Sequence, residues 1–253
     1  MSNSKKQPIQ RKSRTPRRIA VGLAALAGIG FAAHQVNEST RNATYEEALS
    51  DPTKRQAYAR SLLQNKPNYV DIEYMPTGLL AQLKGEGYEL PFGAFAITVP
   101  HERNPFKIGG KSTIILTDEC FALNYRKARQ AWTDIDLLVR NVVENHEKVH
   151  AHHYHEGILG YDIKDLTNSR GELNEPLFKT ISELLAHVEE NKGLKEKSKM
   201  AKTGLLENQS SHMVNLMMMP HYVQLSNPQV TYGMNPAFIQ RLQRDLHPKK
   251  LLQ

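Results

Sequence analysis

Hydrophobic and polar residues follow one another with the period of an α-helix along most of the chain. Together with its glycine, proline and capping signals, this pattern predicts helices over residues 52–65, 77–84, 131–155, 174–190, 205–219 and 236–246. Thr44 and Glu47 have the spacing of a capping box, which predicts a further helix start. The lysine-rich stretch 192–204 contains two glycines and is predicted to be an exposed connection.

Two short stretches have the composition of strands. Residues 92–99 (FGAFAITV) and 112–117 (STIILT) are rich in β-branched and aromatic residues, and Gly109 and Gly110 stand just before the second stretch. We expect them to form an antiparallel pair joined by a long loop. The predicted fold class is therefore α+β and mostly helical, with a short antiparallel sheet before the long helix at 131–155.

The first 37 residues differ from the rest of the chain. They contain seven Lys and Arg residues and no acidic residue, and they include an apolar run at 19–33. At about 1.5 Å per residue this run is short for a bilayer core of about 30 Å. Basic residues before an apolar run indicate an export signal or a membrane anchor at 19–33, with an organelle presequence as the alternative. The body after residue 38 is then expected on the extracytoplasmic side, and cleavage of the segment stays open.

Charge and cysteine content restrict the remaining functions. The net charge is +7, but the chain after residue 37 carries 26 basic and 26 acidic residues, so no nucleic-acid partner is expected. Residues 38–253 are long enough for a single domain, with 205–253 as its helical C-terminal part. Because Cys120 is the only cysteine, a metal ion would have to be held by histidine and carboxylate. The oligomeric state is not indicated.

An HExxH motif lies in the long predicted helix. His146 and His150 are separated by one helical turn, so both imidazoles can reach one Zn²⁺ ion, and Glu147 can accept a proton from water activated there. The apolar residues before the motif continue at helical spacing into both histidines, which predicts that they face the core. Two buried core histidines without a metal are the alternative interpretation.

At this point the sequence resembles the zincin metallopeptidases, in which a short antiparallel sheet precedes a helix that carries HExxH. The resemblance implies His146 and His150 as zinc ligands and Glu147 as the general base. In the gluzincin branch the third ligand is a glutamate on a later helix in an ExxA context, which Glu183 matches. His187 then occupies the position where relatives often carry an aspartate that orients a ligand histidine, so it is expected to support the site from outside the ligand set.

Other residues compete for the third-ligand position. Glu183 and His187 lie on the polar side of an amphipathic helix, which would look the same if that side were solvated. The alternatives are His153, one turn beyond the motif, and Asp162 and Asp165 after the next glycine. The group that stabilises the oxyanion is also undetermined, with candidates in His212, His221, Tyr222 and Tyr232.

The resemblance implies a zinc-dependent peptidase with one Zn²⁺ ion and a polypeptide substrate. In zincins an edge strand commonly receives the substrate in extended form, which makes 112–117 or 92–99 the candidate strand. Two other functions stay open. One is a non-catalytic, exported or membrane-tethered protein that binds metal or is purely structural, and the other is a zinc hydrolase that acts on a non-peptide substrate.

Overall fold

The computed structural model describes residues 44–63, 66–85, 94–101, 109–122, 135–158, 160–201 and 216–251. The predicted basic segment and the apolar run at 19–33 lie outside the described residues, as do residues 131–134 and 205–215 of two predicted helices. Within the described ranges, no helix combines the length and the hydropathy needed to cross a bilayer.

Short helices precede the sheet. They are α2 (Tyr45–Ser50), the 3-10 turn η2 (Pro52–Lys54), α3 (Arg55–Ser61) and α4 (Thr77–Gly85). The predicted capping box is present, since the Thr44 side chain accepts from the Glu47 amide and the Glu47 carboxylate accepts from the Thr44 amide. The single helix predicted over 52–65 is shorter than expected, because it begins as a 3-10 turn and α3 ends at Ser61.

The sheet has three strands in the order β1-β3-β2, where β1 is Val70–Tyr74, β2 is Ala96–Pro100 and β3 is Ser112–Leu116. The predicted antiparallel pair is confirmed as β2 and β3. Strand β1, which pairs with β3 in parallel, was not predicted. Its alternation of buried and exposed residues is short, and its pairing with β3 depends on long-range contacts that sequence spacing does not show.

One long helical rod carries the motif. It consists of α6 (Ile135–Val142), the π-helical segment η4 (Val143–Glu147) and α7 (Lys148–Glu156). The rod ends as predicted at Gly157, which adopts a positive φ of 86° that favours glycine. It is followed by the 3-10 turn η5 (Ile163–Leu166) and by α8 (Glu175–Ala201).

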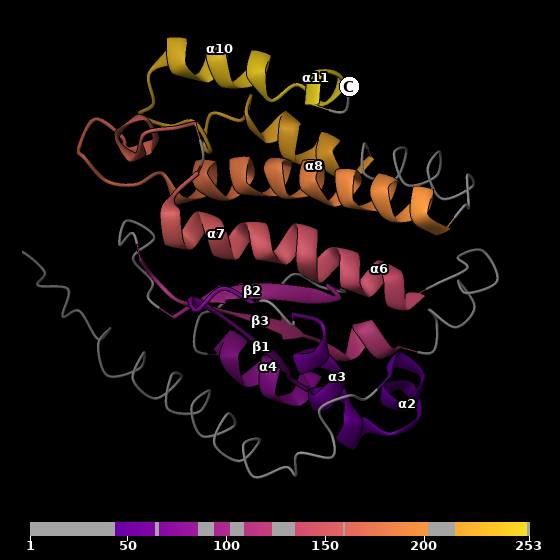
Figure 1. Ribbon diagram of the computed structural model, residues 1–253. Coiled ribbons are helices and arrows are strands. Elements are labelled where there is room, and N and C mark those ends of the chain that lie inside the picture. The colour runs from indigo at the N-terminus through magenta and orange to yellow at the C-terminus, as the bar shows by residue number, and fades with distance from the viewer. Residues whose placement is uncertain are drawn as a thin grey trace, which may run out of the picture.

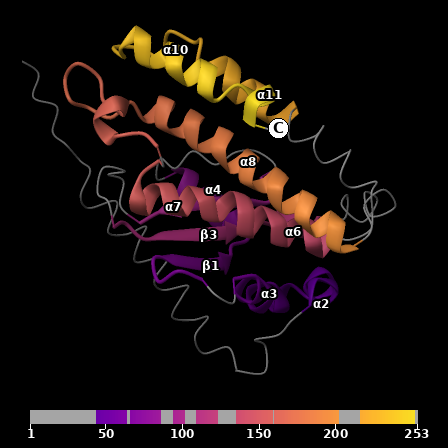
Figure 2. The same ribbon diagram turned by 45° about the horizontal axis from the view of Figure 1, so that its top comes forward.

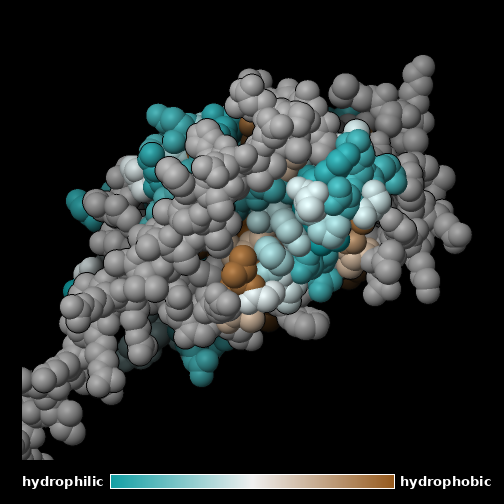
Figure 3. Space-filling model, turned by 90° about the horizontal axis from the view of Figure 1, so that it is seen from below, coloured by the Kyte–Doolittle hydropathy of each residue, from teal (hydrophilic) through white to brown (hydrophobic). Residues whose placement is uncertain are grey.

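The elements form layers (Figures 1 and 2). The rod α6–η4–α7 lies against the sheet and shares an apolar cluster with α3, whereas α4 packs with the alternate strand residues Ile97, Val99 and Ile115. Helix α8 lies along the other side of the rod. A helical segment at 216–224, α10 (Pro236–Asp245) and α11 (Pro248–Leu251) cover α8 in turn. Seen from below, the described residues on the face turned to the viewer are mainly hydrophilic, with only small hydrophobic areas (Figure 3). The rod is thus enclosed between sheet and α8.

Two apolar clusters fix this arrangement. Val139, Val143 and Ala151 of the rod are buried in a cluster with the strands and α3. Leu177, Ile181 and other residues of α8 form a second cluster with the C-terminal helices. Since the second cluster occupies the outer side of α8, the polar side of α8 is turned toward the rod. The polar residues of α8 therefore lie between two helices.

The basic stretch after residue 190 is not an exposed connection, because α8 continues without interruption to Ala201. Gly193, which was expected to break the helix, allows α8 to approach the rod closely. The Asn141 side chain donates to the backbone carbonyl of Glu190 at 3.0 Å, and Asn145 donates to Asn141 at 2.8 Å. A Cβ atom at position 193 would overlap both asparagine side chains.

Replacing Gly193 with alanine is accordingly expected to destabilise the protein, although alanine favours helix formation over glycine by about 1 kcal/mol. The overlap with Asn141 and Asn145 forces the two helices apart, and overpacking of this kind costs about 1–3 kcal/mol. Urea denaturation measures the effect. Gly78, whose Cβ would meet no atom within 4 Å, is the matched control, and a G193A variant as stable as G78A would contradict the close approach.

A second stability effect concerns Glu73 on β1. Its Oε1 atom is buried without a hydrogen-bond partner among the described residues, and burial, followed by the charge of Asp71, raises the pKa of the carboxyl to about 7. The unfolded chain ionises Glu73 near pH 4.5, so the native state loses stability as the pH rises from there to about 7.

Glu73→Gln removes this penalty. The variant is expected to match the parent protein near pH 4 and to be more stable by roughly 1–2 kcal/mol at pH 8, after allowance for partial solvent exposure. Urea denaturation at several pH values tests this expectation, with the exposed Glu196→Gln as the control. A stability gain that does not change with pH would show that Glu73 is ionised normally.

Candidate metal centre

The π-helical segment η4 determines which side chains of the motif are turned toward α8. The amide of Lys148 donates to the carbonyl of Val143, five residues earlier, which adds one residue to this turn compared with an α-helix. The side chains of Val139, Val143 and Ala151 meet the sheet, whereas His146 and His150 contact α8. The histidines are buried, as predicted, but in the interface between two helices and not in the apolar core.

His146, His150 and Glu183 come together at this interface. The two Nε2 atoms lie 3.2 Å apart, His146 Nε2 lies 3.5 Å from one oxygen of Glu183, and His150 Nε2 lies 3.5 Å from the other. Ligands at the 2.0–2.1 Å typical of Zn²⁺ lie about 3.3 Å apart in a tetrahedron. The distances between the three donor atoms are therefore close to those between the ligands of a tetrahedral zinc ion. The three residues thus fit a metal ion.

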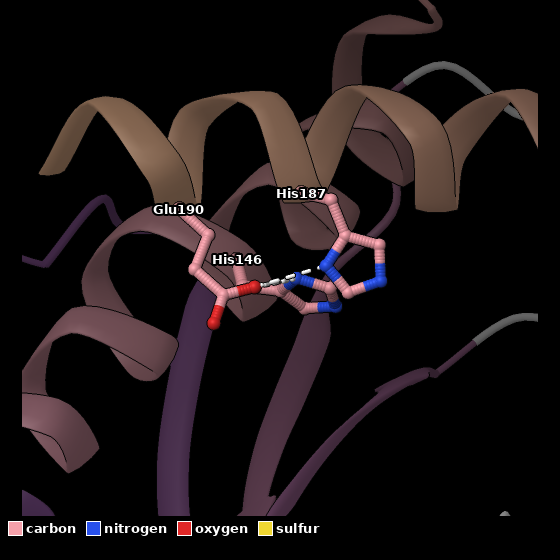
Figure 4. A group of neighbouring side chains, drawn as sticks. All are labelled: His146, His187 and Glu190. Atoms are coloured by element: carbon pink, nitrogen blue, oxygen red, sulfur yellow. Dashed lines mark hydrogen bonds and ion pairs between the residues drawn. The ribbon is translucent and has the colours of Figure 1, made fainter. Parts of the chain in front are cut away.

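The outer ring nitrogens have partners of their own. His146 Nδ1 lies 3.1 Å from Glu190 Oε2, and His187 Nδ1 lies 3.0 Å from the same oxygen (Figure 4). His150 Nδ1 lies 2.7 Å from the Ser182 hydroxyl. A carboxylate on Nδ1 keeps the proton there and leaves Nε2 as the free donor, which is the usual arrangement of metal-binding histidines.

The charges at the site are strongly coupled. Burial acts to lower the pKa of His146, but its contacts with Glu183 and Glu190 raise it to about 10. Burial acts to raise the pKa of Glu183, but His146 and His150 hold it well below its usual range. The pKa of Glu190 falls to about 2, because His146 and His187 outweigh its burial. The carboxylates of Glu183 and Glu190 thus favour a positive charge on the neighbouring imidazoles. A metal ion can supply this positive charge in place of a proton.

Glu147 is buried beside the site, on the side of the sheet. The Thr98 hydroxyl of β2 lies 2.8 Å from Glu147 Oε2 and 2.9 Å from its backbone carbonyl. The charge of Glu147 also contributes to the raised pKa of His146. Thr98 therefore links the edge of the sheet to the glutamate of the motif, and sequence analysis did not identify it.

His187 lies next to the three candidate ligands, but contrary to the expectation it does not orient a ligand histidine through a hydrogen bond. It does not bond to a ligand histidine; Glu190 does, and His187 shares that carboxylate. Glu190 lies on the same polar side of α8 as Glu183 and His187, but no role was predicted for it from the sequence. The signal was present, since three residues able to bind metal or protons lie at i, i+4 and i+7 on one helix face.

The competing ligands lie elsewhere. His153 Nδ1 lies 2.8 Å from the Ser182 hydroxyl, and burial lowers the pKa of His153 to about 3. Asp162 caps η5 by accepting from the Lys164 amide, and Asp165 pairs with Arg241. None of the three belongs to a group of described residues that can hold a metal ion.

The described residues considered for oxyanion stabilisation lie at different distances from the cluster. The ring of His221 lies 5.8 Å from that of His187, so this residue adjoins the cluster. Tyr222 donates to the carbonyl of Gln243, and Tyr232 is 76% exposed. His212 lies outside the described residues. Of the candidates that the structure describes, His221 alone is near the site.

Comparison with known proteins gives no further assignment: no protein-family model, curated protein or solved structure matches this chain. The arrangement itself defines a mostly helical α+β protein with a buried cluster of histidine and glutamate that can hold a metal ion.

Proposed function

We propose that this protein is a zinc-dependent metallopeptidase of the gluzincin type. The observation that carries the proposal is the triangle of His146 Nε2, His150 Nε2 and the Glu183 carboxylate, with sides of 3.2, 3.5 and 3.5 Å. The same helix turn supplies Glu147, a second carboxylate that is not part of the triangle. Three protein ligands and a separate glutamate are the components that zinc-dependent hydrolysis requires.

The donor set favours zinc. Imidazole suits several first-row metals, but two imidazoles and one carboxylate in a compact, three-ligand arrangement are typical of catalytic zinc, which keeps one position open for water. The single cysteine, Cys120, is buried in the apolar cluster under α3, so it takes no part in the site.

Each residue then has a defined role. Zinc held by His146, His150 and Glu183 would lower the pKa of a water molecule and polarise the scissile carbonyl. Glu147 accepts the proton of the attacking water and passes it to the departing amine. Thr98 orients the Glu147 carboxylate, Glu190 holds the His146 imidazole in the tautomer that leaves Nε2 free, and Ser182 holds the His150 ring in place.

The substrate strand is β2. Strand β3 pairs on both sides within the sheet, so the candidate at 112–117 is wrong. Among the described residues β2 pairs on one side only, and its Thr98 contacts Glu147. An extended peptide that pairs with β2 would pass beside the general base, which supports the candidate at 92–99.

The place of action follows from the N-terminal composition. The basic residues and the apolar run at 19–33 favour export or membrane attachment, with the body on the extracytoplasmic side. We propose that the polypeptide substrates are encountered there. Fractionation of cells that express the full-length chain tests this location.

The test of function uses the purified full-length protein. Zinc content is measured by mass spectrometry, and cleavage of an unstructured protein is followed with and without a chelator. The expected result is zinc-dependent cleavage that returns when zinc is restored. Bound zinc with cleavage of small amides or esters only would favour the non-peptide hydrolase. Bound zinc with no hydrolysis of the unstructured protein or of small amides and esters would favour the non-catalytic metal-binding protein.

A further inference from the structure

We propose that the protein binds a second metal ion next to the first, held by Glu183, His187 and His221, with the Glu183 carboxylate shared between the two ions. This inference rests on the metal site of the proposed function, because both sites use Glu183, but it does not depend on peptidase activity.

The distances define the second site. Each of three residues, Glu183, His187 and His221, has a ligand atom within 4.8 Å of a ligand atom of the other two. The ligand atoms of His146, His150 and Glu183 also lie within 4.8 Å of one another. Glu183 belongs to both groups. A carboxylate has two oxygens and can give one to each of two ions, and ions in two-metal sites lie about 3.5–4 Å apart. The shared glutamate therefore allows both ions to be present together.

The hydrogen bond of His187 is the second, independent observation. Its side chain is 3% exposed, and its Nδ1 atom is held by Glu190. The Nε2 atom of His187 lies on the side of the ring away from Glu190, so it is not engaged by that carboxylate (Figure 4). A buried imidazole with a carboxylate on one nitrogen and a free lone pair on the other has the form of a metal ligand.

His146 provides the internal comparison. Its Nδ1 atom is held by the same oxygen of Glu190, and its Nε2 atom points to the first site. Glu190 thus binds the Nδ1 atoms of both His146 and His187 and leaves both Nε2 atoms available to a metal ion. The two rings also contact each other, with centroids 4.6 Å apart, so both imidazoles belong to one cluster around the Glu190 carboxylate.

The third ligand comes from a different part of the chain. His221 lies in the helical segment 216–224, is half-buried, and its ring is 5.8 Å from that of His187. One of its ring nitrogens lies within 4.8 Å of a ligand atom of Glu183 and of His187. The second ion would therefore join the C-terminal helical layer to α8, and two imidazoles with one carboxylate again suit zinc.

Metal stoichiometry tests this proposal. The full-length protein is freed of metal with a chelator, exchanged into buffer, and titrated with Zn²⁺ and separately with Co²⁺ in a calorimeter. We expect about two ions per chain, and about one in the His221→Ala and His187→Gln variants. The half-buried His247→Ala, just before α11, is the matched control, because His247 belongs to no candidate metal group among the described residues, and it should keep both ions. Circular dichroism of the metal-free variants verifies that they fold.

The outcomes separate the two proposals. One ion per chain in both the parent protein and His221→Ala, with hydrolysis lost in the variant, would overturn the second ion and assign His221 to oxyanion stabilisation. Two ions in the parent and two in His221→Ala would overturn this ligand set. No bound ion in the parent protein would overturn the proposed function together with the second site.

Discussion

Replacing Glu147 with glutamine is expected to lower the rate of peptide hydrolysis by about 10²–10⁴-fold while the zinc content stays unchanged. Glutamine has the shape of glutamate and can still receive the hydrogen bond from Thr98, but it cannot accept the proton of the attacking water. Because the Glu147 side chain lies outside the metal-binding triangle, the ligands keep their positions. Initial rates of cleavage and metal analysis on the same preparation measure both quantities.

Glu156→Gln is the matched control for this experiment. Glu156 ends the same helix, its side chain is exposed, and it lies near His152. The control should retain both the zinc and the rate of the parent protein. An E147Q variant that hydrolyses peptide at the parent rate would refute the assignment of Glu147 as general base. A variant that loses its zinc would show that the carboxylate is a ligand.

Replacing Glu183 with alanine is expected to remove bound zinc. The variant loses one of three ligands and the carboxylate that lies 3.5 Å from both imidazoles. The loss of zinc affinity should exceed the roughly 10–100-fold expected for Glu190→Gln, which removes only an outer contact. Competition with a chromogenic zinc chelator measures the dissociation constants of both variants.

His153→Gln is the control for the choice of third ligand. His153 is also buried near the motif, but its Nδ1 atom is bonded to Ser182, and it belongs to no candidate metal group among the described residues. Zinc affinity should be retained in this variant. If zinc were lost in His153→Gln and retained in Glu183→Ala, the gluzincin arrangement would be wrong, and the ligand set would come from a single helix.

The motif could be predicted from sequence because its chemistry depends on local spacing. His146, Glu147 and His150 lie within two turns of one helix, and any helix brings them together. The antiparallel pair β2 and β3 could be predicted for a similar reason, because composition and a glycine pair mark it. These features need no knowledge of the rest of the chain.

Features that depend on packing were harder to predict. The polar side of α8 looked like a solvated surface, since sequence does not show that the rod covers it. Gly193 looked like a helix break, because its role depends on Asn141 and Asn145 of another helix. The π-helical turn at Val143–Glu147 leaves no composition signal, and the parallel strand β1 pairs with a partner about forty residues away.

The position of Ser182, Glu183 and Glu190 on α8 links metal binding to the packing of the C-terminal half. The inner side of α8 carries the candidate metal ligands, and its outer side forms an apolar cluster with residues up to Leu246. Any tilt or slide of α8 that loosens this cluster also changes the ligand spacing. By mass action, zinc that binds only the aligned position stabilises the distant cluster, and disruption of that cluster weakens zinc binding by the same free energy. Contacts between α10 and α8 are therefore expected to affect the zinc affinity of the triangle of His146, His150 and Glu183, although no residue of α10 belongs to that triangle.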